Sequence, residues 1–285
     1  MNTDASSVGT IVTRTLIAFA AVALAGALVF DDYGGFERLR MDEVRLLDEP
    51  VPGGLSVLFV GNSHTYHYDI PFIVERLAAA DPGAAPMFVD MAADPGVTLS
   101  HHVAPGSRAR AIAGSREWDV IILQNRSHAV LDPEVFAAEL DASVRAFEPH
   151  ARRVVLYQTW AWGEQGGAFG RRPGGTERMN ALVMKTYEDG MTAHPGLEGA
   201  PVGGAFARVR QELRLPVTGG DGNHLNDVGA FVASCVVFTS ITSRPCPETA
   251  DRLRVRLETR MAADLLKLLR ETPPSKPLSD GAPGR

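Results

Sequence analysis

The feature that most constrains the fold is an alternation of short apolar runs with longer amphipathic segments between Leu55 and Arg270. The apolar runs are rich in β-branched residues, as buried strands are, and cover Leu55–Val60, Met87–Met91, Val120–Leu123, Val154–Tyr157 and, less clearly, Pro201–Phe206. Helical patterns cover Pro71–Ala80, Pro133–Phe147, Glu177–Ala193, Asn226–Thr242 and Ala250–Leu269. Continuous apolar strands separated by helices predict a parallel sheet covered on both faces, which is a three-layer α/β/α sandwich.

The bulk composition bounds the class of protein. A chain of 285 residues with 45% hydrophobic residues can bury one large core, so one main domain is expected. The formal net charge is −6 at pH 7 and no cluster of lysine and arginine occurs. Because nucleic-acid binding depends on concentrated positive charge, we expect no nucleic-acid partner.

The two ends of the chain differ in composition from the middle. An uncharged apolar run, Thr15–Phe30, follows Arg14 and precedes acidic residues, which is the polarity of an export signal. We therefore interpret residues 1–30 as a signal peptide or a membrane anchor, 31–54 as a linker and 55–271 as the main domain. Residues 272–285 are rich in Pro, Gly and Ser without an apolar face, and are predicted to be disordered.

The two cysteines leave two possibilities open. Cys235 lies in an apolar helical segment and Cys246 lies beyond it, next to two prolines. Export would permit a disulfide between them, but their spacing fixes no geometry. Two free thiols are the simpler interpretation.

The segment "VLFVGNSHTY", 57–66, delivers a serine to the end of a predicted strand. Ser63 follows Gly61 and Asn62 and precedes a helix, so its hydroxyl can face solvent while neighbouring backbone N–H groups face a developing negative charge. Functional residues of parallel sheets gather at the carboxyl ends of the strands, where Ser63 lies.

A serine nucleophile needs a base, and the best candidate lies far downstream in "GGDGNHLNDVGAF". Asp221 and His224 are three residues apart, just before the predicted helix Asn226–Thr242. The carboxylate can accept one imidazole N–H and fix the tautomer, while the other ring nitrogen faces Ser63.

The motifs "GNSHT", "PGVTLSHH", "LQNRS" and "DGNHLND", in this order, resemble those of the SGNH (GDSL-type) hydrolase superfamily of serine esterases and acyl-transfer enzymes. The resemblance covers most of Leu55–Arg244. It implies a five-stranded parallel sheet in flavodoxin-like order, with Ser63 as nucleophile, His224 as general base and Asp221 as its partner. It also implies an oxyanion hole formed by the backbone N–H groups of Ser63 and Gly96 and by an amide side chain of "LQNRS".

The chain departs from the family pattern at two places. The family's Asp before the serine is Asn62 here, and the family's Gly-x-Asn-Asp block reads "QNRS". A strict alignment puts Arg126 where the family has asparagine. We predict Asn125 as the third oxyanion donor because its amide is the family's chemical type, with Gln124 as the alternative.

Other side chains carry weaker signals. Four histidines suggest a metal cluster, but no cysteine or carboxylate spacing completes a site, so no metal is predicted; they are His64, His67, His101 and His102. Trp160 and Trp162 would lie on the same side of a continued strand, either lining the substrate pocket or filling the core. The Gly-rich "GGAFGRRPGG" is expected to be a mobile loop near the site.

These observations predict an exported serine esterase that needs no cofactor, periplasmic, extracellular or anchored to a membrane facing outward. The favoured substrate is a small acyl ester, such as acetyl on a glycan. Two alternatives stay open: an acyltransferase that passes the acyl group to a cell-envelope glycan, and a non-catalytic binding module on the same fold.

Overall fold

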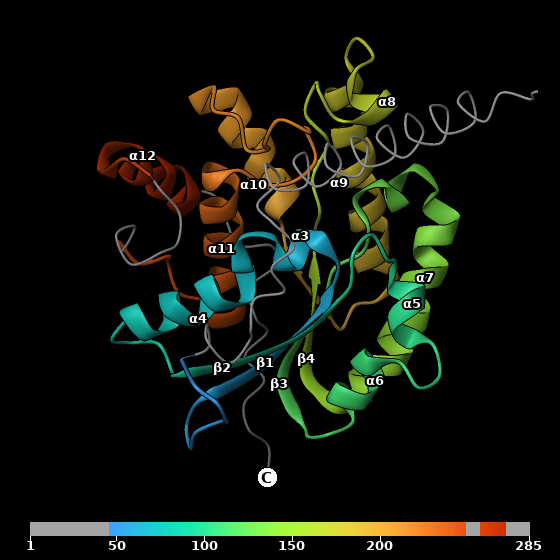
Figure 1. The fold of residues 1–285 in the computed structure, drawn as a ribbon, viewed down its shortest axis with the longest axis vertical. Coiled ribbons are helices and arrows are strands. Elements are labelled where there is room, and N and C mark those ends of the chain that lie inside the picture. Colours follow the sequence, from blue (N-terminus) through green and yellow to red (C-terminus); the bar gives the residue numbers. More distant parts are fainter. Residues whose placement is uncertain (1–45, 249–256, 272–285) are drawn as a thin grey trace, which may run out of the picture. The chain divides into compact units, whose positions relative to one another are not determined.

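All five strands of the central sheet run parallel, in the order β2-β1-β3-β4-β5 (Figure 1). The computed structural model describes residues 46–248 and 257–271. The strands are β1 (Leu55–Gly61), β2 (Met87–Ala93), β3 (Trp118–Leu123), β4 (Ala151–Tyr157) and β5 (Leu197–Ala200). The predicted α/β sandwich with a five-stranded parallel sheet in flavodoxin-like order is confirmed.

The first four strands lie where the apolar runs place them, but the fifth does not. The run Pro201–Phe206 belongs mostly to helix α10 (Val202–Arg208), and β5 precedes it. The run is apolar because α10 buries Val202, Ala205 and Phe206. β5 itself reads Leu-Glu-Gly-Ala and contains no β-branched residue, so it gives no strand signal.

Helices cover both faces of the sheet. The side chains of β1 alternate between these faces, so they reach both layers of helices. Leu58 and Val60 join the core that includes residues of α7 and α9. In Figure 1, α4 and α11 lie on one side of the sheet, and α5, α6 and α7 lie on the other. The main helices are α4 (Ile70–Ala80), α5 (Leu99–Val103), α6 (Arg108–Ala113), α7 (Pro133–Phe147), α9 (Gly175–Ala193), α11 (Asp227–Thr242) and α12 (Thr259–Arg270).

Four of the five predicted helices are confirmed to within two residues at either end. The fifth, Ala250–Leu269, is confirmed only from Thr259 onward as α12, and residues 249–256 lie outside the described part of the chain. Short helices fill the connections: α3 (Ser63–Tyr66) directly after β1, and α8 (Gly167–Gly170) within the predicted Gly-rich loop.

The predicted leader, most of the predicted linker and the predicted tail lie outside the described residues. Of the linker, 46–54 is described, and the backbone N–H groups of Leu46 and Leu47 donate to the carboxylate of Glu75 on α4. Leu47 also packs against the core. Among the described helices, none combines the length and the apolar composition that crossing a bilayer requires.

Cys235 and Cys246 form a disulfide, so the free thiols favoured above are wrong. Cys235 is buried in α11, and the bond ties this helix to the segment that follows it. The 11-residue separation is short, but sequence spacing alone does not show that the chain turns back after Thr242.

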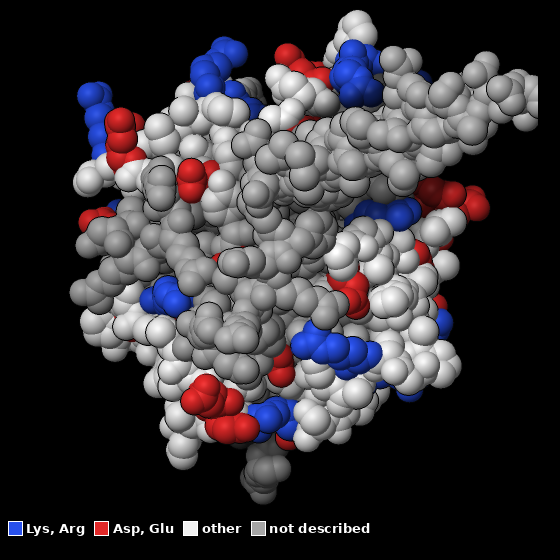
Figure 2. Space-filling model, viewed as in Figure 1, with Lys and Arg blue, Asp and Glu red and all other residues white. Residues whose placement is uncertain are grey.

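The charged side chains on the face in Figure 2 are mixed. Lysine and arginine of the described residues are interspersed there with aspartate and glutamate rather than gathered in one patch. The expectation of no nucleic-acid partner stays a prediction.

Candidate active site

The carboxyl end of β1 leads directly into the short helix that begins with Ser63. The Asn62 side-chain oxygen accepts the His64 backbone N–H at 3.1 Å and so caps this helix. Gly61 has no room for a side chain, because a Cβ would lie 2.2 Å from Thr65 Oγ1 and 2.5 Å from Gln124 Oε1. The sequence Gly-Asn-Ser therefore makes a tight strand-to-helix turn with the serine at its tip.

The structure brings Ser63, His224 and Asp221 together in one chain of hydrogen bonds. Ser63 Oγ lies 3.0 Å from His224 Nε2, and His224 Nδ1 lies 2.5 Å from Asp221 Oδ2. This is the arrangement in which a base can remove the serine proton while a carboxylate orients the imidazole.

Asp221 is held as an anion by its surroundings. Burial opposes its ionisation, but hydrogen bonds from His224 and from two backbone N–H groups outweigh burial and hold the pKa of Asp221 well below its usual range. Those backbone groups belong to Asn223 and His224, and each donates to Asp221 Oδ1 at 2.9 Å. The carboxylate therefore carries a fixed negative charge beside the His224 ring.

A second loop holds the Asp221–His224 segment in place. Gly222 has φ +66°, and a Cβ there would lie 2.3 Å from the backbone nitrogen of Gly166. The Gly222 carbonyl in turn accepts the Gly163 N–H at 2.7 Å. Only glycine fits this close crossing, so the predicted Gly-rich loop does lie beside the site, where it supports the Asp221–His224 segment.

The loop after β2, which carries Gly96, is held by residues that follow β1 and β3. Asn62 Nδ2 donates to Val97 O at 2.9 Å, Arg126 Nη1 donates to Gly96 O at 3.2 Å, and Asn125 Oδ1 accepts the Leu99 N–H at 3.2 Å. An aspartate at position 62 could cap α3 equally well but could not donate to a carbonyl oxygen. Asn62 and Arg126, which both depart from the family pattern, thus both donate hydrogen bonds to this loop.

Both predicted third donors have their amide groups engaged within the protein. Asn125 is fully buried, and its Nδ2 donates to Glu139 Oε2 at 2.8 Å. Gln124 Oε1 accepts from Asn62 N at 2.9 Å and from Thr65 Oγ1 at 2.8 Å, and its Nε2 donates to the Asn125 carbonyl. The assignment of Asn125 to the oxyanion hole stays a prediction, and its amide also has a structural task.

Glu139 is the residue of this network that the sequence interpretation missed. It is buried on α7 and also accepts a hydrogen bond from Ser100 Oγ at 2.8 Å. The signal that could have revealed it is its position: it lies between Phe136 and Leu140 on the apolar face of α7, where an acidic side chain needs a buried donor.

The four histidines that suggested a metal cluster lie in two separate groups. His64 and His67 lie next to His224, with ring centroids 5.7 and 5.1 Å from its ring. His101 and His102 lie instead with Asp94, and these three offer donor atoms within 4.8 Å of one another. Asp94 is a carboxylate that the sequence did not pair with them. His101 Nε2 lies 3.4 Å from Asp94 Oδ2, and His102 Nε2 lies 2.6 Å from Gly61 O, so both rings already have protein partners.

The two tryptophans do not lie on one continued strand, because β4 ends at Tyr157. Trp160 is fully buried, and its Nε1 donates to Asn223 O at 2.8 Å. Trp162 is half-buried and donates to Ser127 Oγ at 2.9 Å. Trp160 is therefore a core residue that also contacts the base loop.

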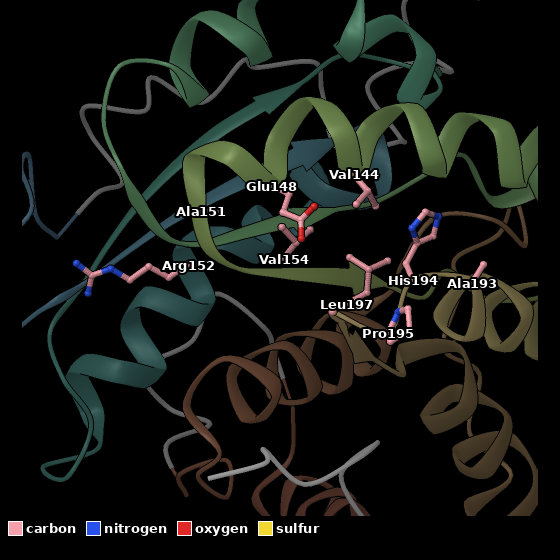
Figure 3. Close-up of a pocket in the computed structure, with 10 residues that line it drawn as sticks. Val144, Glu148, Ala151, Arg152, Val154, Ala193, His194, Pro195 and Leu197 are labelled. Carbon is pink, nitrogen blue, oxygen red and sulfur yellow. The ribbon is translucent and has the colours of Figure 1, made fainter. Parts of the chain in front are cut away.

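A cavity of about 220 Å³ lies at the opposite edge of the sheet, at the amino ends of β4 and β5 (Figure 3). Glu148, Arg152 and His194 are among the residues that line it, and no residue of the predicted site does.

Comparisons with known proteins support the fold. No protein-family model and no curated protein matches this sequence. Among solved structures, a candidate SGNH hydrolase from Slackia heliotrinireducens is 21% identical with a TM-score of 0.56, covering 66% of this chain and 99% of its own. A DUF4886 family protein from Bacteroides uniformis is 17% identical with a TM-score of 0.61, covering 75% and 93%. The acetyl-xylooligosaccharide esterase Axe2 from Geobacillus stearothermophilus, as an R-to-A mutant, is 17% identical with a TM-score of 0.51, covering 68% and 96%. The chain has the SGNH-hydrolase fold.

Proposed function

We propose that this chain is a serine esterase in which Ser63 is the nucleophile, His224 the general base and Asp221 its partner. The observation that carries the proposal is the unbroken hydrogen-bond chain from Ser63 Oγ through the His224 ring to the Asp221 carboxylate. These three residues come from two segments about 160 positions apart and meet at the carboxyl edge of the sheet.

The proposed reaction has two steps. His224 Nε2 accepts the Ser63 proton as Oγ attacks the ester carbonyl, and the imidazolium then protonates the departing alcohol, leaving an acyl-enzyme. A water molecule, deprotonated by His224, then attacks the acyl carbon; the bond to Ser63 Oγ breaks, the imidazolium returns its proton to Oγ, and the acid leaves. The Ser63 and Gly96 backbone N–H groups and the Asn125 amide are the proposed donors to the oxyanion.

The similar structures support the substrate class. Axe2 is described as an acetylxylan esterase, and its catalytic mutants include the replacement of a serine and of an aspartate by alanine. We propose a small acyl group, such as acetyl, on a glycan as the substrate of this chain. The disulfide in α11 favours an oxidising compartment, which supports export and the interpretation of the apolar N-terminal run as a signal or an anchor.

Purified protein assayed for acetate release from an aryl acetate and from acetylated xylo-oligosaccharides tests this function. We expect turnover of both by the native chain, and none by Ser63→Ala. Ser115→Ala is the matched control, because Ser115 is an exposed serine beyond α6 and contacts only Ile112 through its hydroxyl.

The same assay separates the alternatives. If acyl transfer to an added glycan exceeds acetate release, the chain is a transferase with the same nucleophile. If the folded chain binds the acetylated glycan without turnover, it is a binding module and the esterase proposal fails.

A further inference from the structure

We propose that Asn223 is a positioning residue that holds His224 at its working distance from Ser63, with His64 as its partner. This inference rests on the proposed function and adds a second contact between the nucleophile segment and the base segment. Ser63 pairs with His224, and the next residue, His64, pairs with the preceding one, Asn223. The two segments are therefore joined by two neighbouring side-chain contacts.

Asn223 makes hydrogen bonds through its side-chain oxygen and through both of its backbone polar groups. Its Oδ1 lies 3.1 Å from His64 Nε2 and accepts from Ser127 Oγ at 3.3 Å. Its carbonyl accepts Trp160 Nε1 at 2.8 Å, and its N–H donates to Asp221 at 2.9 Å. The residue is therefore tied to segments that follow three different strands of the sheet, β1, β3 and β4.

These contacts fix the state of His64. Since an amide oxygen only accepts, His64 Nε2 must carry the hydrogen of this bond. His64 is buried and stacks on Trp160, with ring centroids 4.2 Å apart and planes 16° apart. Burial and the neighbouring His224 lower the pKa of His64 to about 3, so the ring stays neutral throughout the pH range in which an esterase works.

A neutral donor suits this position beside the base. The titratable groups that face His224 are Asp221, His64 and His67. A second imidazolium at position 64 would repel the imidazolium that forms on His224 in the reaction. A neutral His64 instead supplies a directional hydrogen bond, so it holds the geometry of the base without repelling a positive charge on His224.

The distance between base and nucleophile makes this contact matter for rate. A misplacement of about 1 Å can cost about 10²-fold in rate. Asn223 is covalently next to His224, so loss of its two side-chain bonds, to His64 and Ser127, loosens the backbone that carries the base. Because Asn223 acts through the position of the base, we expect kcat to change more than KM.

Two variants at this position and one nearby separate positioning from general stability. Asn223→Ala removes the acceptor and should lower kcat about 10–10²-fold with little change in KM. Asn223→Asp keeps the acceptor and adds a negative charge that favours the His224 imidazolium. Its activity should approach that of the native chain at high pH, while the acid limb of its pH–rate profile moves to higher pH.

Asn226→Ala is the matched control. It makes the same change two residues beyond His224, where Asn226 caps α11 and bonds to Pro216 and Gly229 but not to the nucleophile segment. We expect a lower melting temperature and a kcat within about threefold of the native value.

Labelling of Ser63 by a fluorophosphonate, followed by peptide mapping, distinguishes the failure of this inference from the failure of the proposed function. A native chain that is not labelled overturns both. A native chain that is labelled, with Asn223→Ala labelled at the same rate and turning over within twofold, overturns only the positioning role. Equal impairment of Asn223→Asp and Asn223→Ala at every pH also overturns it.

Discussion

The two edges of the sheet use polar residues in opposite ways. At the carboxyl edge, Asn62, Gln124 and Asn125 are buried and make hydrogen bonds to neighbouring loops. At the amino edge, Arg152 is exposed, and its guanidinium reaches Glu117 and Asp119 at 3.3 Å each. The three buried amides of the first edge are bonded within the protein, while Arg152 of the second edge presents its charge to water beside the cavity of Figure 3.

This difference indicates where the loss of one hydrogen bond would cost the most free energy. A buried polar group without a partner costs about 1–3 kcal/mol, so a cluster of them persists only where each is bonded. Exposed ion pairs contribute about 0–1 kcal/mol and need no such precision. Substitutions at the carboxyl edge should therefore change activity, and those at the amino edge should change little.

The largest effect is expected from the triad itself. Ser63→Ala and His224→Ala should each lower kcat by about 10⁴–10⁶, and the double variant should be little worse, because a base without its nucleophile does nothing. Kinetics of the three folded variants on an aryl acetate measure this. Additive losses would mean that the two residues do not act as a unit.

Loss of the disulfide should change stability without changing the site. Cys246→Ser should lower the free energy of unfolding by about 2–4 kcal/mol, since the bond restricts the unfolded chain. Denaturant unfolding of the oxidised native chain and of the variant measures it, with kcat at 25 °C as the control. A large loss of kcat in the folded variant would show that the disulfide also holds the site, which would contradict this prediction.

A smaller effect is expected from Asn62→Asp, which restores the family's residue. The carboxylate still caps α3 but faces the Val97 carbonyl without a hydrogen to donate, so the Gly96 loop loses one of its holders. We expect kcat to fall about tenfold, the equivalent of about 1.4 kcal/mol. An unchanged or higher kcat would show that this contact does not shape the oxyanion hole.

The smallest effect is expected at the amino edge. Arg152→Ala removes an exposed ion pair with Glu117 and a second with the half-buried Asp119, which keeps its hydrogen bonds from Ser56. It should change the free energy of unfolding by less than about 0.5 kcal/mol, with kcat unchanged. Thermal unfolding and the aryl acetate assay check it together. A loss above 2 kcal/mol would contradict the contrast between the edges.

The sequence predicted what depends on local pattern. The apolar run before Ser63 and the Asp221–His224 spacing are short-range signals, and the structure brings these three residues together. The run Pro201–Phe206 predicts a strand where the structure has a helix, because a buried helix and a buried strand are both apolar over six residues.

Contacts between distant segments were beyond sequence reasoning. The pairing of His64 with Asn223 joins residues 159 positions apart, and the buried Glu139 meets Asn125 only after α7 packs. Neither contact has a periodic signature, because both depend on how the loops meet at the edge of the sheet. The disulfide is similar, since it depends on the turn of the chain after α11.

The most direct test of the central claim is covalent capture of the nucleophile. The native chain is treated with a fluorophosphonate probe, digested, and mapped by mass spectrometry. We expect one adduct, on the peptide that contains Ser63, and its loss in His224→Ala, because the serine is not activated without its base. An adduct on another serine, or equal labelling of His224→Ala, would contradict the assignment of Ser63 and His224 as nucleophile and base.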